Sequence, residues 1–363
     1  MKATIKKLGY FLFILVIALS ANTVLFGKPN EKFTKTVSKA FASTPQTYLR
    51  VDNKFGTISV TNWDKPEVSI EVSIEVQTNT KQEADKTLDG ITIRLNQLQD
   101  TIIASTIFDE KSEKIKGFFN MGQSVKEFSV NYTIKLPKQT NLIASQKFGD
   151  VSIEEINGFA AINVKYGNLR IGQLTRGNTQ PLNSIDLGYA EGTIEKLGWC
   201  SIDLKFSKLS INSTKAAVFV SKHSTVEVEN ASSIVVKGKF DNYKIGKIKN
   251  LVAEGSYTEF KVKTLSGKLS VDGKFGGIRV DQVTNSFEEI QIDLEHAGIK
   301  LGIAPEISYK IDATSNFGNI NISDDSKLNK ITKNTSNQMY GNVGNNPTAT
   351  VKIRTKFGDI DIE

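Results

Sequence analysis

The residues of this chain that could carry chemistry recur at fixed positions in one repeated phrase. A lysine, an aromatic residue and a glycine are followed by alternating apolar residues, as in KFGTISV at 54–60, KFGDVSI at 147–153 and KFGDIDI at 356–362. Degenerate copies such as KFSKLSI and KHSTVEV fill the interval between the clear ones. A regular row of ammonium groups would attract a polyanion, so the first chemistry to consider is binding rather than catalysis.

The lysine occurs in eight of the twelve copies of the repeat, and two interpretations of this lysine column are possible. One interpretation is a solvated face that resists aggregation, with lysine stems covering the edges of the rings. The other is a basic stripe that binds a polyanion, an anionic glycan or another envelope polymer such as the phosphate groups of lipopolysaccharide. Nucleic acid is not expected as a partner. The lysine column consists of Lys54, Lys147, Lys165, Lys205, Lys222, Lys239, Lys274 and Lys356.

An aromatic or imidazole ring fills the next position in every copy. Apolar residues alternate on both sides of it, which predicts that the rings point inward and form a structural stack inside the fold. His223 and His296 belong to this column, so they are expected to replace Phe or Tyr as core rings, without a catalytic or metal-binding role. The aromatic column consists of Phe55, Phe148, Tyr166, Tyr189, Phe206, His223, Phe240, Tyr257, Phe275, His296, Phe317 and Phe357.

The other reactive side chains are sparse. The single cysteine, Cys200, excludes a disulfide framework and is expected to be a buried, inert strand residue. Adjacent acid pairs occur, as at 154–155, 288–289 and 324–325, but neighbours in a strand point to opposite faces. Acids from stacked turns could still flank a glycosidic bond, which leaves a β-helix polysaccharide-processing enzyme as the alternative function. No phosphate-loop, HExxH or EF-hand motif is present, and neither a cofactor nor a metal is expected.

The elements that position these columns must repeat every 17–18 residues, the commonest spacing between successive rings. Period-two alternation on each side of the ring indicates two short strands per repeat. Such a repeat cannot bury its apolar side alone, but stacking in parallel on its neighbours solves this. The expected fold is therefore all-β, a parallel β-solenoid (β-helix) with turns about 4.8 Å apart.

The first 21 residues have a basic start, an apolar run and small residues at the end, which is typical of a secretory signal peptide. Removing residues 1–21 removes three lysines and no acid, so the net charge falls from +7 to +4. An uncleaved anchor reaching Phe26 is the alternative. The mature chain has no further apolar run of spanning length and is expected to be exported, to the periplasm or the cell surface.

The remaining sequence divides by composition. Residues 22–43 are expected to be a linker, 44–145 a β-rich N-terminal cap region, and 146–363 the solenoid, with a polar loop at 323–350. Within the cap, a short helix is expected at 81–88 and a long strand ending before Pro137. A cap is needed because an open strand edge invites aggregation.

The repeated Phe-Gly turns resemble those of the putative-adhesin β-helix family of exported bacterial envelope proteins, a domain of unknown function. The strongest matches are YLRVDNKFGTISV at 48–60, KLPKQTNLIASQKFGDVSI at 135–153 and VKIRTKFGDIDI at 351–362. The resemblance covers about residues 44–363 and implies an exported protein without assigned catalytic residues. The expected function is a non-enzymatic, adhesin-like binding or structural role in the cell envelope.

Overall fold

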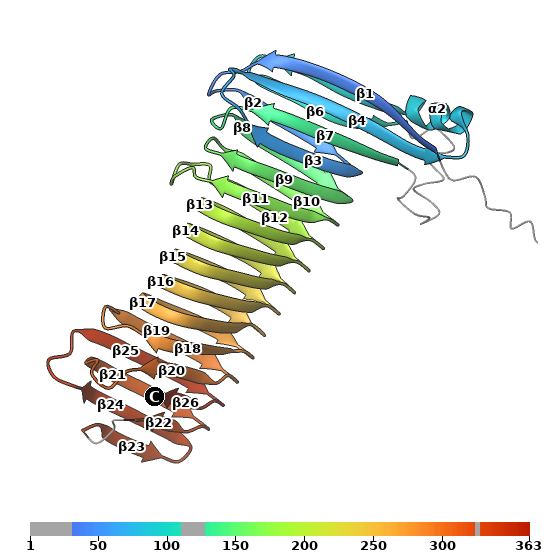
Figure 1. The fold of residues 1–363 in the computed structure, drawn as a ribbon. Helices are drawn as coiled ribbons and strands as arrows, with labels where there is room; N and C mark the ends of the chain where they lie inside the picture. The colour runs from blue at the N-terminus through green and yellow to red at the C-terminus, as the bar shows by residue number, and fades with distance from the viewer. Residues whose placement is uncertain (1–30, 110–127, 324–326) are drawn as a thin grey trace, which may run out of the picture.

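The computed structural model describes residues 31–109, 128–323 and 327–363, which form a long all-β stack with one short helix (Figure 1). Along most of the stack, each turn pairs in parallel with the turns before and after it, so the fold is β-solenoid-like. The predicted signal peptide at 1–21 lies outside the described residues. Within the described ranges, no helix is long and apolar enough to cross a membrane.

Each of the five central turns is a single long strand. Alternating side chains point into the stack, and the apolar ones are buried: Leu209 and Ile211 in one strand lie over Val226 and Val228 in the next. Most intervening positions carry polar residues that face solvent, which explains why the sequence alternates; Val218, Val220, Val235 and Val252 are exposed exceptions. These strands are β13 (Glu191–Lys205), β14 (Lys208–Lys222), β15 (Thr225–Lys239), β16 (Asn242–Ser256) and β17 (Glu259–Lys274).

Each long strand contributes its first half to one face of the stack and its second half to the other. The first half of β13 pairs with one strand and its second half with another, and the pairing between β13 and β14 skips positions 195 and 198. The chain therefore bends there and encloses the core between two faces. Flanking turns use separate strands for the two faces: β8 (Asn141–Lys147), β9 (Gly149–Ile156), β10 (Ala160–Lys165), β11 (Asn168–Leu174), β12 (Asn183–Gly188), β18 (Gly277–Val283), β19 (Glu289–Glu295) and β20 (Ile299–Ile303).

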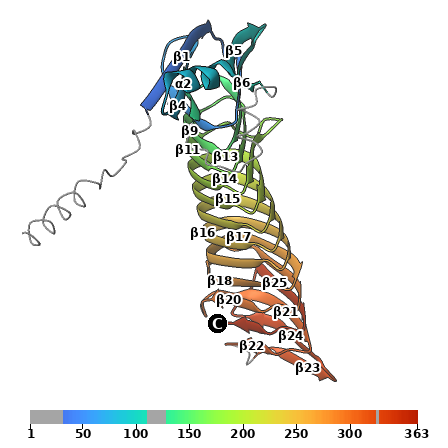
Figure 2. The same cartoon turned by 90° about the vertical axis from the view of Figure 1, so that its right-hand side faces the viewer.

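The N-terminal end carries antiparallel strands and the helix, seen turned by 90° in Figure 2. The predicted linker is wrong at 31–42, because this segment forms a strand paired along its whole length with β4. The predicted helix is confirmed, and the Thr80 hydroxyl caps it by accepting a hydrogen bond from the Glu83 amide. The elements are β1 (Glu31–Ala42), β2 (Tyr48–Asn53), β3 (Gly56–Asn62), β4 (Glu67–Thr78), α2 (Lys81–Asp89), β5 (Ile91–Leu98), β6 (Thr101–Phe108) and β7 (Phe128–Leu136).

The C-terminal end departs from chain order. The turn at 349–362 lies between the turn at 289–303 and the turn at 309–322, because β25 pairs with both β19 and β21. The predicted loop at 323–350 is also wrong, since much of it forms an antiparallel hairpin that extends the sheet beyond β21. The elements are β21 (Tyr309–Asn316), β22 (Ile320–Ile322), β23 (Asn329–Lys333), β24 (Ser336–Val343), β25 (Ala349–Lys356) and β26 (Ile360–Ile362).

Candidate binding surface at the aromatic corner

The aromatic residues form the tight corner of every turn except the first. From Phe148 to Phe357, each has a positive φ between 52° and 61°. The corner is fixed by a hydrogen bond from the aromatic amide to the next turn, as from Phe206 N to Lys222 O (3.0 Å) and from His223 N to Lys239 O (3.0 Å). A positive φ is unusual for residues with a bulky side chain, so this conformation needs support from the surrounding stack.

The rings stack along the outside of the fold, so the predicted internal position is wrong for most of the column. Neighbouring centroids are 4.6–5.4 Å apart and the rings are within 3–18° of parallel. Tyr189 and Phe206 are 54% and 47% exposed. His223 and His296 are exposed members of the same stack rather than core rings. Because the ring faces cover one another, the column presents ring edges to solvent.

The first corner shows why the others turn outward. Phe55 is buried against Phe108 and Phe128, and the positive φ belongs instead to the following residue, Gly56, at 98°. When the glycine takes the unusual conformation, the ring continues the strand alternation and points in. At the other corners the aromatic residue takes it, which directs the ring outward, and the residue that follows is buried wherever it is not glycine.

The lysine column lies beside these rings in strand register, with breaks at Gly188, Ser256, Glu295 and Asn316. Lys205, Lys222 and Lys239 are paired on successive strands, and all three are exposed. Four lysines lie near their own following ring: Lys54, Lys147, Lys239 and Lys356, with Nζ 5.0–5.8 Å from the ring centroid. Such exposed cation–π contacts are weak, about 0.5–1 kcal/mol, and leave the ammonium groups accessible.

The column is interrupted near its C-terminal end. Glu295 stands in the lysine position and pairs with Lys274 (2.6 Å) and Lys356 (3.7 Å). The hydrogen bond from Lys274 lowers the pKa of the Glu295 carboxyl. Of the three central lysines of the column, Lys205, Lys222 and Lys239, Lys205 is paired with a carboxylate, that of Asp203 at 3.0 Å. The ammonium groups of Lys222 and Lys239 at the middle turns, like those of Lys147 and Lys165 nearer the N-terminal end, have no carboxylate partner among the described residues.

A buried polar ladder, which was not predicted from the sequence, supports the corner from inside. It consists of the residues directly after four successive rings, Ser207, Ser224, Asp241 and Thr258, each at most 7% exposed. The Ser207 amide donates to Ser224 Oγ (3.2 Å), and the Ser224 amide donates to Asp241 Oδ1 (2.7 Å). The signal was the small polar residue after each ring, which can satisfy backbone groups freed by the turn.

Asp241 is the most heavily bonded member of this ladder. Its Oδ2 accepts hydrogen bonds from the Lys239 amide (2.7 Å) and the Ser221 hydroxyl (2.8 Å). Burial raises the pKa of the Asp241 carboxyl, and the three hydrogen bonds oppose that shift. This carboxyl is therefore a structural group beneath the corner, not an exposed acid.

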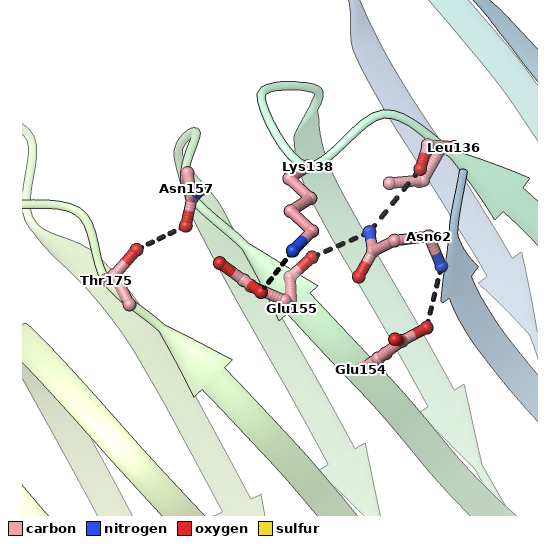
Figure 3. Close-up of polar contacts among 7 residues, drawn as sticks. All are labelled: Asn62, Leu136, Lys138, Glu154, Glu155, Asn157 and Thr175. Atoms are coloured by element: carbon pink, nitrogen blue, oxygen red, sulfur yellow. Dashed lines mark hydrogen bonds and ion pairs between the residues drawn. The ribbon is translucent and has the colours of Figure 1, made fainter. Parts of the chain in front are cut away.

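The adjacent acid pairs do not form a catalytic pair in the described residues. Glu154 accepts from the Asn62 amide (2.9 Å), and Glu155 pairs with Lys138 (2.8 Å), so both join neighbouring segments (Figure 3). Glu288 lies 3.5 Å from Lys268, and the pair at 324–325 lies outside the described residues. Four grooves on the described surface contain at most one carboxylate each.

Acidic rungs do occur on one face, where register aligns Glu254, Asp272 and Asp293 on successive strands. None of these three lines any of the four grooves. A flat row of exposed acids does not enclose a sugar or exclude water around it, as cleavage of a glycosidic bond would require. No group of three or more potential metal ligands is found among the residues that the structure describes.

Cys200 is buried in β13, as its strand pattern indicated, with 1% of its surface exposed. Burial raises the pKa of the thiol, which removes the reactive thiolate at neutral pH. We expect no reaction of the folded protein with a thiol reagent and one equivalent of reaction in denaturant. Rapid labelling of the folded protein would contradict this assignment.

The stacked parallel strands and repeated aromatic corners define a solenoid-like, all-β repeat protein. The chain belongs to the Toastrack family, DUF4097, whose pattern matches residues 48–363. This confirms the resemblance to a domain family of unknown function. Comparison with curated proteins gave no match.

Several solved structures are similar to the chain over most of its length. A putative cell adhesion protein from Clostridium sporogenes is 11% identical, with 90% of this chain and 99% of that chain covered and a TM-score of 0.17. A putative adhesin from Bacteroides fragilis is 13% identical, with 91% and 97% covered and a TM-score of 0.29. A putative lipid binding protein from Parabacteroides distasonis is 11% identical, with 92% and 97% covered and a TM-score of 0.32. These likenesses carry no argument about ligand or activity.

Proposed function

We propose that this chain is an exported, non-enzymatic, adhesin-like protein of the bacterial cell envelope, and that its aromatic corner binds an extended anionic glycan. The observation that carries the proposal is the lysine column, which runs in strand register beside a continuous, exposed row of ring edges. Aromatic rings are electropositive at their edges, so both rows favour an anionic partner.

The mechanism is the addition of weak contacts along a stiff stack. An exposed ion pair contributes about 0.2–1 kcal/mol, which is too little for a single lysine to hold a ligand. Successive lysines spaced about 4.8 Å apart can contact one extended chain at the same time. Their contributions then add through effective concentration, as in other multivalent binders.

The two ends of the stack fit this function if they act as caps. At the N-terminal end, β7 is followed outward by antiparallel β4 and β1, and at the C-terminal end β21 is followed by β24 and β23. We infer that these antiparallel additions stop further parallel stacking, so that the aromatic corner, rather than an open strand edge, is the surface for partners.

Binding of polygalacturonate tests the proposal. The combined substitutions Lys205→Gln, Lys222→Gln and Lys239→Gln are expected to weaken binding about tenfold at low salt, since three exposed ion pairs are lost. High salt should weaken the wild-type protein to a similar extent. The measurement is calorimetric titration at low and high salt, with product analysis of the same mixtures.

The matched control is Lys261→Gln, Lys263→Gln and Lys310→Gln, which removes the same charge from exposed lysines outside the column. This control should bind nearly as the wild type does. An equal loss of affinity in both triple variants would show that binding depends only on net charge, and would contradict the proposal that the lysine column is the binding surface. Cleavage of the glycan would instead favour the polysaccharide-processing enzyme, and the absence of binding to any anionic glycan would favour a purely structural role.

A further inference from the structure

A second basic groove lies at the bend opposite the aromatic corner. It follows positions 196–198 of β13 and the equivalent positions of the next turns, about midway between successive rings in the chain. Four lysines line it: Lys196, Lys215, Lys247 and Lys249. All four are exposed, and none of them takes part in an ion pair within the described residues.

The groove is hollow because small side chains form its floor. The register aligns Lys196 with Ser213, then Asn230, then Lys247 on four successive strands. Ser213, Ala231 and Ser232 lie between the lysines, where longer side chains would fill the space. Lysine stems therefore stand at both ends of a shallow floor that also carries hydroxyl and amide groups.

These ends set the size of the ligand. Lys196 and Lys247 are three strand spacings apart, which corresponds to about 14 Å along the stack. The rungs beyond them are Gln173 on one side and Thr264 on the other, so the row of charges does not continue. The groove thus differs from the lysine column, which extends along most of the stack.

The local charge favours an anion. No carboxylate lines the groove; Glu195 and Glu229 precede its positions on β13 and β15, and Glu155, two rungs beyond Lys196, interacts electrostatically with that lysine. The Glu195 carboxylate already accepts a hydrogen bond from the Asn212 amide group (3.3 Å). Four unpaired ammonium groups around one hollow repel each other unless an anion neutralises them.

We propose that this groove is a binding site for a compact oligoanion, a sugar of about disaccharide size that carries phosphate or sulfate esters. Ammonium groups at both ends bind the esters, and the floor of Ser213, Asn230 and Ser232 contacts the sugar hydroxyls. This site is separate from the aromatic corner and does not depend on the function proposed for it.

Calorimetric titration with sucrose octasulfate tests the site, with sucrose as the uncharged control. Lys196→Gln, Lys247→Gln and Lys249→Gln together are expected to weaken binding about tenfold or more, because three ion pairs are lost. Ser232→Phe keeps every charge but places a ring on the exposed floor, and it should cause a comparable loss. The column variant Lys205→Gln, Lys222→Gln and Lys239→Gln should bind as the wild type does.

Each result bears on the proposal. Loss in both groove variants, with binding retained in the column variant, supports it. Wild-type affinity in Ser232→Phe would show that charge alone attracts the probe, and equal loss in the two lysine variants would show the same; either result overturns the groove. Circular dichroism of every variant confirms that the β-structure is intact, which exposed substitutions should not disturb.

Discussion

Replacing Asp241 by alanine is expected to destabilise the protein by about 3 kcal/mol, because one buried and one partly buried backbone amide lose their acceptor. These are the amides of Ser224 and Lys239, which donate to the two carboxylate oxygens. The third donor, the Ser221 hydroxyl, keeps a partner in the Tyr243 hydroxyl at 2.6 Å. Urea denaturation measures the free energy of unfolding, and hydrogen exchange should show faster exchange at the two amides.

Two further variants separate the buried contacts from charge. Asp241→Asn keeps one acceptor oxygen but puts an amide group against one of the donors, so it should fall between the wild type and Asp241→Ala. Asp272→Ala removes an exposed aspartate nearly two turns further along and should change stability by less than about 0.5 kcal/mol. If Asp241→Ala were as mild as Asp272→Ala, the polar ladder would not support the corner.

The pH dependence of this effect has a definite sign. Because burial raises the pKa of Asp241 in the folded protein, the folded state holds its proton to higher pH than the unfolded chain does. The stability contribution of the group is complete below the unfolded pKa, about 3.9, and decreases as pH rises through the folded pKa. The difference between wild type and Asp241→Ala should therefore be largest below about pH 4 and smaller at higher pH. An increase of that difference toward neutral pH would contradict the assignment.

Gly167→Ala is the second substitution with a large expected effect. A Cβ at this corner would lie 1.9 Å from the carbonyl oxygen of Gly149 in the preceding turn. Since backbone and not a flexible side chain is in the way, the two turns must separate, and we expect a loss of about 2–3 kcal/mol. Thermal and urea unfolding of the variant measure the loss.

The neighbouring corner shows that the requirement is local. Ala190 holds the equivalent position in the next turn, where the following amide, that of Glu191, donates to the Gly167 carbonyl (3.2 Å). At the tighter corner the Asn168 amide donates instead to the Asp150 carboxylate (2.8 Å). Gly298→Ala is the control, because nothing lies within 4 Å of its added Cβ. Equal stability of the two variants would show that the corner of Gly167 can adopt the geometry of its neighbour.

Much of the fold could be predicted from local pattern. Strand alternation, the repeat of 17–18 residues and the helix after Thr80 all follow from short-range preferences, and the structure has them. The direction of the rings could not be obtained in this way. A prediction from alternation assumes that the backbone is extended throughout. A single residue with positive φ, such as Phe206 or His223, directs its side chain to the face opposite to the one that alternation predicts.

Of the two candidate binding sites, one could be predicted from the local sequence pattern and the other could not. The lysine column was visible because its members share one position in the phrase. The groove was not, because lysine recurs only intermittently at its two repeat positions: Lys196 and Lys247 share one position with Ser213 and Asn230 between them, and Lys215 and Lys249 share the other with Ser232 between them. The order of the C-terminal turns depends on long-range pairing of β25 with β19 and β21, which no local pattern encodes.

That order has a consequence for how the protein is made. The turn of β25 and β26 enters between two turns that precede it in the chain, so during synthesis both neighbours exist before it does. The central turns can be completed one after another as the chain emerges, but this end must be completed by insertion. Until residues 349–362 arrive, β19 and β21 each lack a final partner and offer hydrogen-bonding edges to other extended chains. Folding of the C-terminal end thus depends on how soon residues 349–362 are synthesised after β21.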